Sequence, residues 1–232
     1  MTLALAAGLA AVPVMAAIAT RERRASLRRR SALFDGCLDH FEDNRKTLGP
    51  DGFARVEGNW DSRAVKLSVV PDNLTARRLP QLWLCVTIKA RLPIAEDAAV
   101  LVRPNGAEFF SQAQRLPCRL MPPDSWPGGV LLRGSRPAAQ ALVDSVEMPM
   151  ASLLQNAKVK EIAVTRQGLR AVYQADEGRR GDYLLLRQSA FAGSYIQPST
   201  VVMLVDALLG IEHVLIRGPR HDTAQPRVPA FG

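Results

Sequence analysis

The sequence has little of the residue types that most often build catalytic and metal sites. Among 232 residues there are only 3 Cys and 3 His, with 3 Trp and 3 Tyr. The cysteines, Cys37, Cys85 and Cys118, lie far apart and form no C-x-x-C pair. A chain of this length with so few cysteines is not a disulfide-stapled scaffold, and zinc would need an unpatterned set of distant ligands.

Recognisable chemical motifs are missing as well. The sequence contains no G-x-G-x-x-G, no G-x-x-x-x-G-K-[ST], no H-E-x-x-H and no G-x-S-x-G. Phosphate-cradling loops, zinc proteases and hydrolase nucleophile elbows usually carry these patterns. We therefore expect no enzyme activity, no cofactor and no metal ion. Cys37 and Cys85 sit in apolar patterns typical of inert core thiols, whereas Cys118 lies in a loop beside Arg119 with no nearby histidine.

The net positive charge is concentrated near the two ends of the chain. Lys and Arg number 30 against 22 Asp and Glu, a net charge of +8. Residues 21–30 carry six arginines and one glutamate, or +5, and the tail from Arg217 carries three arginines and one aspartate, or +2. The remaining 31–216 thus hold only +1 (8 − 5 − 2). A nearly neutral body gives no reason to expect nucleic-acid binding.

The N-terminal segment is the longest stretch without charge. Leu3 to Thr20 is 18 residues long, and as a helix it spans about 27 Å, close to the roughly 30 Å hydrocarbon core of a bilayer. We interpret it as a membrane anchor at residues 1–30, with a basic juxtamembrane group. That group consists of Arg21, Arg23, Arg24, Arg28, Arg29 and Arg30.

Two alternatives to an anchor remain open. Ala17-Ile18-Ala19 offers an A-x-A cleavage site for a signal peptide, although no basic residue precedes the apolar stretch. An ordinary buried helix is the other alternative. Under the positive-inside rule, the arginines place the N-terminus outside and the rest in the cytoplasm, at the cell inner membrane. The same arginines could also hold anionic lipid head groups.

Past the anchor, the first half of the chain has mainly strand periodicity. Apolar residues spaced by three and four over 33–41 predict that the anchor helix continues to Leu48-Gly49-Pro50. Alternation then predicts a hairpin over 53–70, a central strand at 82–90 and a second hairpin around Asn105-Gly106. The Pro- and Gly-rich stretch 116–129 is expected to be a loop, where Trp126 is a candidate interaction residue.

The second half mixes helix and strand signals. A strand is expected at 129–134, and Pro137 opens a helix that Pro149 should break or kink. A three-strand meander is predicted over 159–188, then a core helix from about residue 198 and a final strand at 213–218. The Pro-rich tail 218–232 is predicted to be disordered.

These elements predict an α+β domain over 31–217, with a mixed, mainly antiparallel sheet and packed helices, and a possible subdivision near residue 135.

The chain resembles uncharacterised single-pass bacterial membrane proteins of unknown function. The resemblance lies in three segments, VEGNWDSRAVKLSV, RRLPQLWLCVTI and GVLLRGSRPAAQALVD. That resemblance implies an anchor and a β-rich cytoplasmic domain, and no activity. The sequence therefore predicts an interaction or scaffold module that binds another protein or the membrane surface. The alternatives are a ligand-binding or enzymatic cleft near 116–129, and an exported periplasmic domain.

Overall fold

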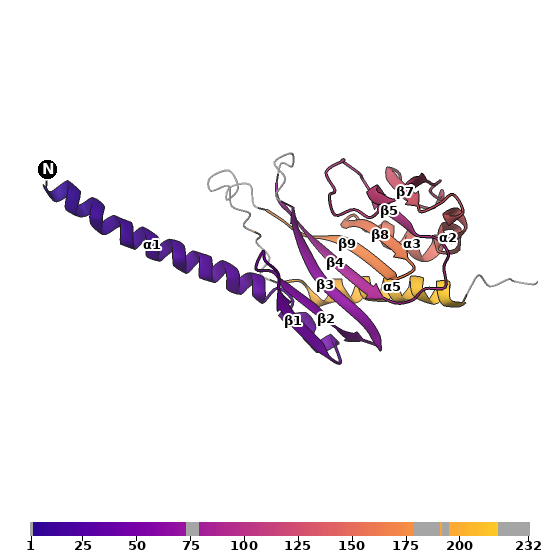
Figure 1. Cartoon of the computed structure of the whole chain (residues 1–232), viewed down its shortest axis with the longest axis horizontal. Coiled ribbons are helices and arrows are strands. Elements are labelled where there is room, and N and C mark those ends of the chain that lie inside the picture. The colour runs from indigo at the N-terminus through magenta and orange to yellow at the C-terminus, as the bar shows by residue number, and fades with distance from the viewer. Residues whose placement is uncertain (1, 73–78, 179–190, 192–194, 218–232) are drawn as a thin grey trace, which may run out of the picture.

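The computed structural model describes residues 2–72, 79–178, 191 and 195–217. It confirms the α+β class: a long antiparallel sheet carries helices on one face, and helix α1 (Thr2–Ser31) extends away from it (Figure 1). The other helices are α2 (Ala139–Ser145), α3 (Glu147–Leu154) and α5 (Pro198–Arg217), with short 3-10 helices η1 (Asp35–His40) and η2 (Ala113–Arg115).

Nine strands of the described residues form one sheet in the order β1-β2-β3-β4-β9-β8-β5-β7-β6, with every neighbouring pair antiparallel. The strands are β1 (Asn44–Leu48), β2 (Ala54–Trp60), β3 (Arg63–Asp72), β4 (Gln81–Lys89), β5 (Ala98–Val102), β6 (Cys118–Arg119), β7 (Val130–Gly134), β8 (Val159–Thr165) and β9 (Gly168–Glu177). Strands from both sides of residue 135 therefore lie in the same sheet.

The predicted hairpin over 53–70 is present as β2 and β3. Asp61 and Ser62 connect the strands with φ of 47° and 61°. Positive φ at both turn positions matches the right-handed twist of the flanking strands. The strand predicted to be central is β4, which pairs with β3 on one side and β9 on the other.

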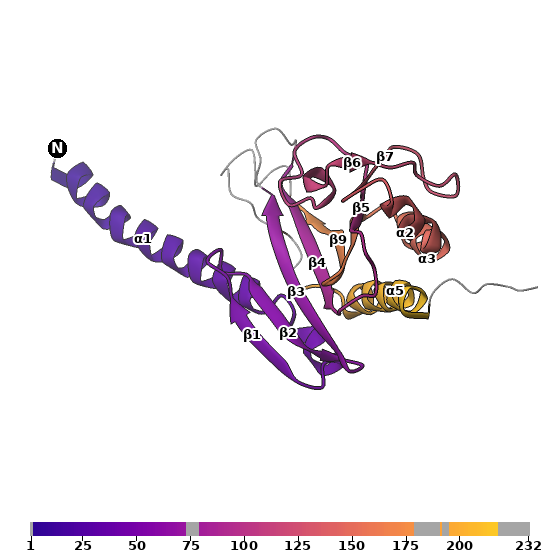
Figure 2. The same cartoon turned by 45° about the vertical axis from the view of Figure 1, so that its right-hand side comes forward.

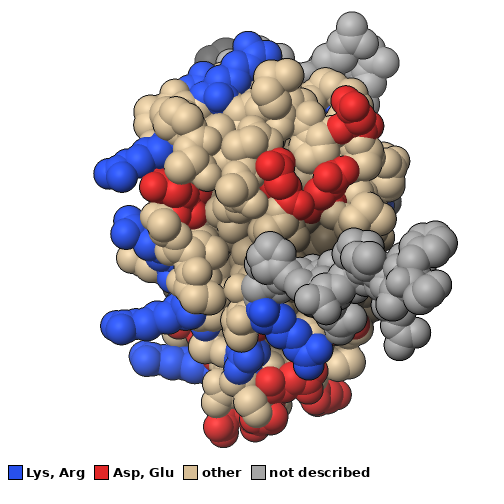
Figure 3. Space-filling view, turned by 90° about the vertical axis from the view of Figure 1, so that its right-hand side faces the viewer, with Lys and Arg blue, Asp and Glu red and all other residues tan. Residues whose placement is uncertain are grey.

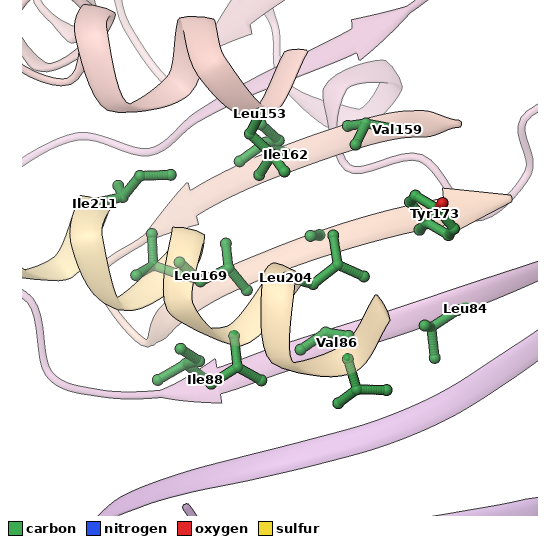
Figure 4. Packing of buried hydrophobic residues seen from close by; sticks show 14 of the residues in the cluster. Leu84, Val86, Ile88, Leu153, Val159, Ile162, Leu169, Tyr173, Leu204 and Ile211 are labelled. Carbon is green, nitrogen blue, oxygen red and sulfur yellow. The ribbon is translucent and has the colours of Figure 1, made fainter. Parts of the chain in front are cut away.

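The main core lies between the sheet and its helices. Helix α5 runs across β4 and β9, and α3 lies beside it over β8 (Figure 4). Val86 and Ile88 of β4 lie beside α5, which carries Leu204 and Ile211, and Leu84 lies further along the same strand (Figure 4). All five of these side chains are fully buried. Helix α5 is thus the predicted core helix. By length and composition it is also the helix, among described residues, that meets the criteria for a membrane span.

The opposite face of the sheet is covered by the segment between β5 and β6, residues 103–117. Phe110 from this segment packs on Trp83 of β4, with ring centroids 5.4 Å apart, and Cys85 and Val172 complete a small apolar cluster. Ala113 joins a second cluster with Ala99, Leu101 and Ala163. Both faces of β4 are therefore buried, as its sequence predicted.

The helix predicted to continue from the anchor to residue 48 is wrong. Helix α1 ends at Ser31, a 3-10 helix follows, and 44–48 is the edge strand β1. The apolar spacing in this region arises because Leu33, Phe34 and Cys37 turn into the core. The edge strand is exposed at all five positions, so its sequence has no apolar alternation to reveal it.

Three further predictions are corrected by the structure. Residues 107–111 form no strand, since β5 pairs with β7 and β8 instead. The helix opened by Pro137 breaks at Val146, so that Pro149 lies in the first turn of α3, where proline is tolerated. Residues 213–217 of the predicted final strand are the last part of α5. The third meander strand (183–188) and the tail (218–232) lie outside the described residues.

Candidate functional site

The segment of α1 that follows residue 14 lies outside the packed core. All side chains from Met15 to Thr20 are exposed, including Met15 at 67% and Ile18 at 49%. Figures 1 and 2 show the helix leading away from the sheet in both views. Exposed apolar helix surfaces are among the features by which sites for a protein partner or a membrane are recognised.

The six predicted arginines follow directly on this helix. Arg21, Arg23, Arg24, Arg28 and Arg29 are exposed. Arg21, Arg24 and Arg28 recur at spacings of three and four, which places them on one face of the helix. Ala17, Thr20 and Ala25 lie between and beside them on the same face.

Arg30 differs from the other arginines because it is bound to the domain. Its Nη1 donates to the Asp51 carbonyl oxygen at 2.9 Å, and its guanidinium lies 4.9 Å from the centre of the Phe53 ring. One turn earlier, Leu27 covers Gly52, where φ is +76° and a Cβ would lie 2.8 Å from Leu27 Cδ2. The end of α1 is thus fixed to the turn between β1 and β2.

The chain enters the core immediately after this joint. Leu33 and Phe34 are buried, and the Leu33 carbonyl accepts a hydrogen bond from the Ile196 N–H at 2.8 Å. Cys37 Sγ lies 3.7 Å from the Ile196 carbonyl oxygen. Helix α1 is therefore joined to the domain through packed residues and not through a flexible linker.

Trp126, the candidate interaction residue, is placed in the core. Only 6% of it is exposed, and its indole N–H donates to the Glu147 carbonyl at 3.1 Å. Leu120 is buried in the same cluster, and Gln140 bonds both main-chain groups of Met121. The loop from 116 to 129 is therefore packed against α2 and α3, and Trp126 offers little surface to a partner.

The cysteines and possible metal-ligand clusters are the remaining groups that could support chemistry. Cys37 and Cys85 are buried, and burial raises the pKa of the Cys37 thiol to about 11 and that of Cys85 above its usual range. Cys118 is half-buried. No cluster of three or more His, Cys, Asp or Glu able to hold a metal ion occurs among the described residues.

A network of buried charges was missed by the sequence analysis. Lys160 Nζ lies 2.7 Å from Glu108 Oε1 and also donates to the carbonyls of Val102 and Arg103. The Glu161 carboxylate accepts hydrogen bonds from the Gln112 N–H and the Ser111 hydroxyl. These bonds fasten residues 103–117 to the sheet. The adjacent pair Lys160-Glu161 within an apolar strand was the available signal.

Comparisons with known proteins give little further information. No protein-family model matches the chain, and no curated protein matches it. Among solved structures, the chain is similar to the crystal structure of the mycobacterial trehalose monomycolate transport factor A, TtfA, with a TM-score of 0.42 and 10% identity. The match covers 84% of this chain and 98% of that one. A TM-score of this size does not establish a shared fold.

Proposed function

We propose that this chain is a membrane protein anchored by α1, with its domain in the cytoplasm. The observation that carries the proposal is an uncharged helical stretch, residues 3–20, whose side chains from Met15 onward lie exposed outside the core. Transfer of such a surface from water into hydrocarbon is favourable, and its length of about 27 Å suits a bilayer core of about 30 Å.

The arginines supply the orientation. Six of them lie within ten residues on the C-terminal side of the uncharged stretch, whereas Met1 and Thr2 on its other side are not basic. A flank this unequal favours retention of the arginine side in the cytoplasm. The domain that follows α1 is then cytoplasmic, where reduced cysteines are the normal state.

We further propose that the domain is a non-enzymatic module that binds another protein. The supporting observations are two exposed methionines: Met121, whose main chain bonds to Gln140 of α2, is 75% exposed, and Met148 in α3 is 74% exposed. Both belong to segments held by the hydrogen bonds of Gln140 and Trp126. Methionine is enriched at protein interfaces because its flexible side chain adapts to different partners.

Membrane anchoring is tested by extracting whole membranes with alkaline carbonate. The full chain is expected to remain in the pellet. Leu9→Lys combined with Val12→Lys should release it, since each lysine near the helix centre costs roughly 2.5–3.5 kcal/mol of insertion energy. The matched control, Leu9→Ala with Val12→Ala, should stay in the pellet. Release of the unmodified chain, or a mature product that begins after Ala19, would contradict the anchor.

The interaction role is tested by site-specific photo-crosslinking in cells. A photoreactive residue at position 148 should give a discrete protein adduct that disappears when Met121 is changed to Asp. The same residue at position 39, an exposed position in η1, serves as the control and should give no such adduct. Equal adducts at both positions would rule out a specific surface near Met148.

A further inference from the structure

We infer that Arg21, Arg24 and Arg28 form a stripe that binds the head groups of anionic phospholipids. The inference rests on the proposed anchoring by α1 and adds to it a specific lipid class and a specific helix face. Neither is required by the positive-inside rule, which counts basic residues irrespective of the face they occupy.

The three arginines share a narrow part of the helix surface. At about 100° per residue they fall within an arc of roughly 60°. The residues between and beside them on the same helix face are Ala17, Thr20 and Ala25. Small side chains here leave room for a phosphate between long guanidinium groups.

This stripe faces away from the joint with the domain. On the same helical geometry, Arg30 lies about 150° from the centre of the stripe and Leu27 about 90° from it. Arg30 is already bound to Asp51 and Phe53, and Leu27 covers Gly52. The helix thus separates Arg30, which holds the domain, from the three stripe arginines, which face away from that joint.

The three stripe arginines are available to bind an anion. Each of the three is exposed, and none forms an ion pair with an acidic residue in the described part of the chain. Guanidinium groups bind phosphate oxygens with paired, charge-assisted hydrogen bonds. An unpaired cluster of this kind favours an anionic partner.

The position of the stripe selects phospholipid as that partner. Arg21 follows directly on the uncharged stretch, and Arg28 lies about 10 Å further along the helix axis. This distance matches the Debye length of roughly 8–10 Å over which the surface potential of anionic lipids acts. With residues 3–20 in the bilayer, the head groups are therefore the nearest anions to all three arginines.

The test uses the full chain reconstituted in bilayers of phosphatidylcholine and phosphatidylglycerol in equal amounts. Lipids retained after mild detergent extraction are counted by native mass spectrometry. Wild type should retain phosphatidylglycerol in preference. Arg24→Gln with Arg28→Gln should lower the retained ratio at least about fivefold, the effect of roughly one arginine near an anionic surface. The control, Arg23→Gln with Arg29→Gln, removes the same charge from other faces and should keep the preference.

An equal loss in both double variants would overturn the stripe in favour of diffuse attraction. So would wild type without preference for phosphatidylglycerol. Flotation of the wild type and both double variants with neutral phosphatidylcholine vesicles separates the proposal of membrane anchoring from that of the stripe. If wild type fails to float, the anchoring itself is wrong, whereas flotation without lipid preference removes only the stripe.

Discussion

Lys160 and Glu161 are successive charged residues that both lie in the interior, with 5% and 0% exposed. Successive residues of a regular strand point to opposite faces, so one of the two would normally point into the apolar core between the sheet and its helices. The register of β8 against β9 shifts between Val159 and Glu161. This bulge turns Lys160 toward Glu108. The Glu161 carboxylate accepts hydrogen bonds from the N–H groups of Gln112 and Ala113 at the start of η2.

The Glu108–Lys160 pair should contribute far more to stability than an exposed pair does. Glu108→Gln leaves the Lys160 charge buried, and we expect a loss of about 3–5 kcal/mol in the free energy of unfolding. Glu57→Gln is the matched control, because Glu57 also pairs with lysines but is 46% exposed; its cost should stay below about 1 kcal/mol. Urea denaturation of the full chain in mild detergent measures both. Equal costs would contradict the structural role of the pair.

Glu108 also makes the free energy of unfolding depend on pH in the acid range. Burial acts to raise the pKa of Glu108, but bonds from Lys160 and the Asn105 N–H outweigh it and hold the pKa below its ordinary value. A carboxyl whose pKa is lower in the folded state stabilises above its unfolded pKa of about 4.3. The contribution is lost as pH falls through the folded pKa. Glu108→Gln should flatten that part of the stability profile, and an unchanged acid limb would contradict this assignment.

Cys37 predicts a second pH effect, at the alkaline end. Burial raises its pKa to about 11, so the folded protein keeps the thiol proton where the unfolded chain loses it. Stability should therefore fall as pH rises above the unfolded value of roughly 8.5 and up to the folded one. In Cys37→Ala, the free energy of unfolding measured by denaturation should fall less steeply with pH between these limits than it does in wild type. Parallel declines in the two proteins would be evidence against the buried neutral thiol.

At the scale of elements, α5 is the helix on which the sheet packs. Ile211→Ala removes a fully buried side chain from its inner face and should cost about 2–5 kcal/mol. Ile216→Ala makes the same chemical change in the same helix at a position 52% exposed, and its effect should fall within about 0.5 kcal/mol. Thermal or urea unfolding of the two variants compares them directly. A large cost at both positions would show that α5 does not bury the face described.

Elements whose packing follows a simple period could be predicted from the sequence. The β2–β3 hairpin alternates, β4 is apolar on both faces, and the first part of α5 has apolar residues on its inner side. The edge strand β1 could not be predicted because all its residues are exposed. The last turns of α5 resembled a strand because His213-Val214-Leu215-Ile216 is rich in β-branched and apolar residues, a preference that packing on the sheet overrides.

The candidate site was predictable in part for the same reason. Charge counts alone located the six arginines, because they depend on composition and not on fold. The separate role of Arg30 depends on Asp51 and Phe53, some twenty residues away, and no local pattern reports such a contact. Trp126 was expected to be accessible because its neighbours are Pro and Gly, yet its ring fills the space beside Glu147.

At the scale of the whole molecule, the positive charge is concentrated on the helix that extends away from the domain. The end of the domain opposite α1 carries Lys and Arg together with Asp and Glu, with no single sign dominating (Figure 3). The concentrated positive charge lies on α1, beside the segment proposed to enter the membrane. Because α1 passes into the core without a linker, an anchored helix would hold the domain at a defined orientation to the bilayer.

The topology of the chain tests this account most directly. Paired reporters, one active only in the cytoplasm and one only outside it, are fused in turn to the N-terminus and to the end of the full chain. We predict that the C-terminal fusion is active with the cytoplasmic reporter alone and the N-terminal fusion with the external reporter alone. A C-terminal fusion active outside the cytoplasm, or both fusions active inside, would contradict a single α1 anchor with a cytoplasmic domain.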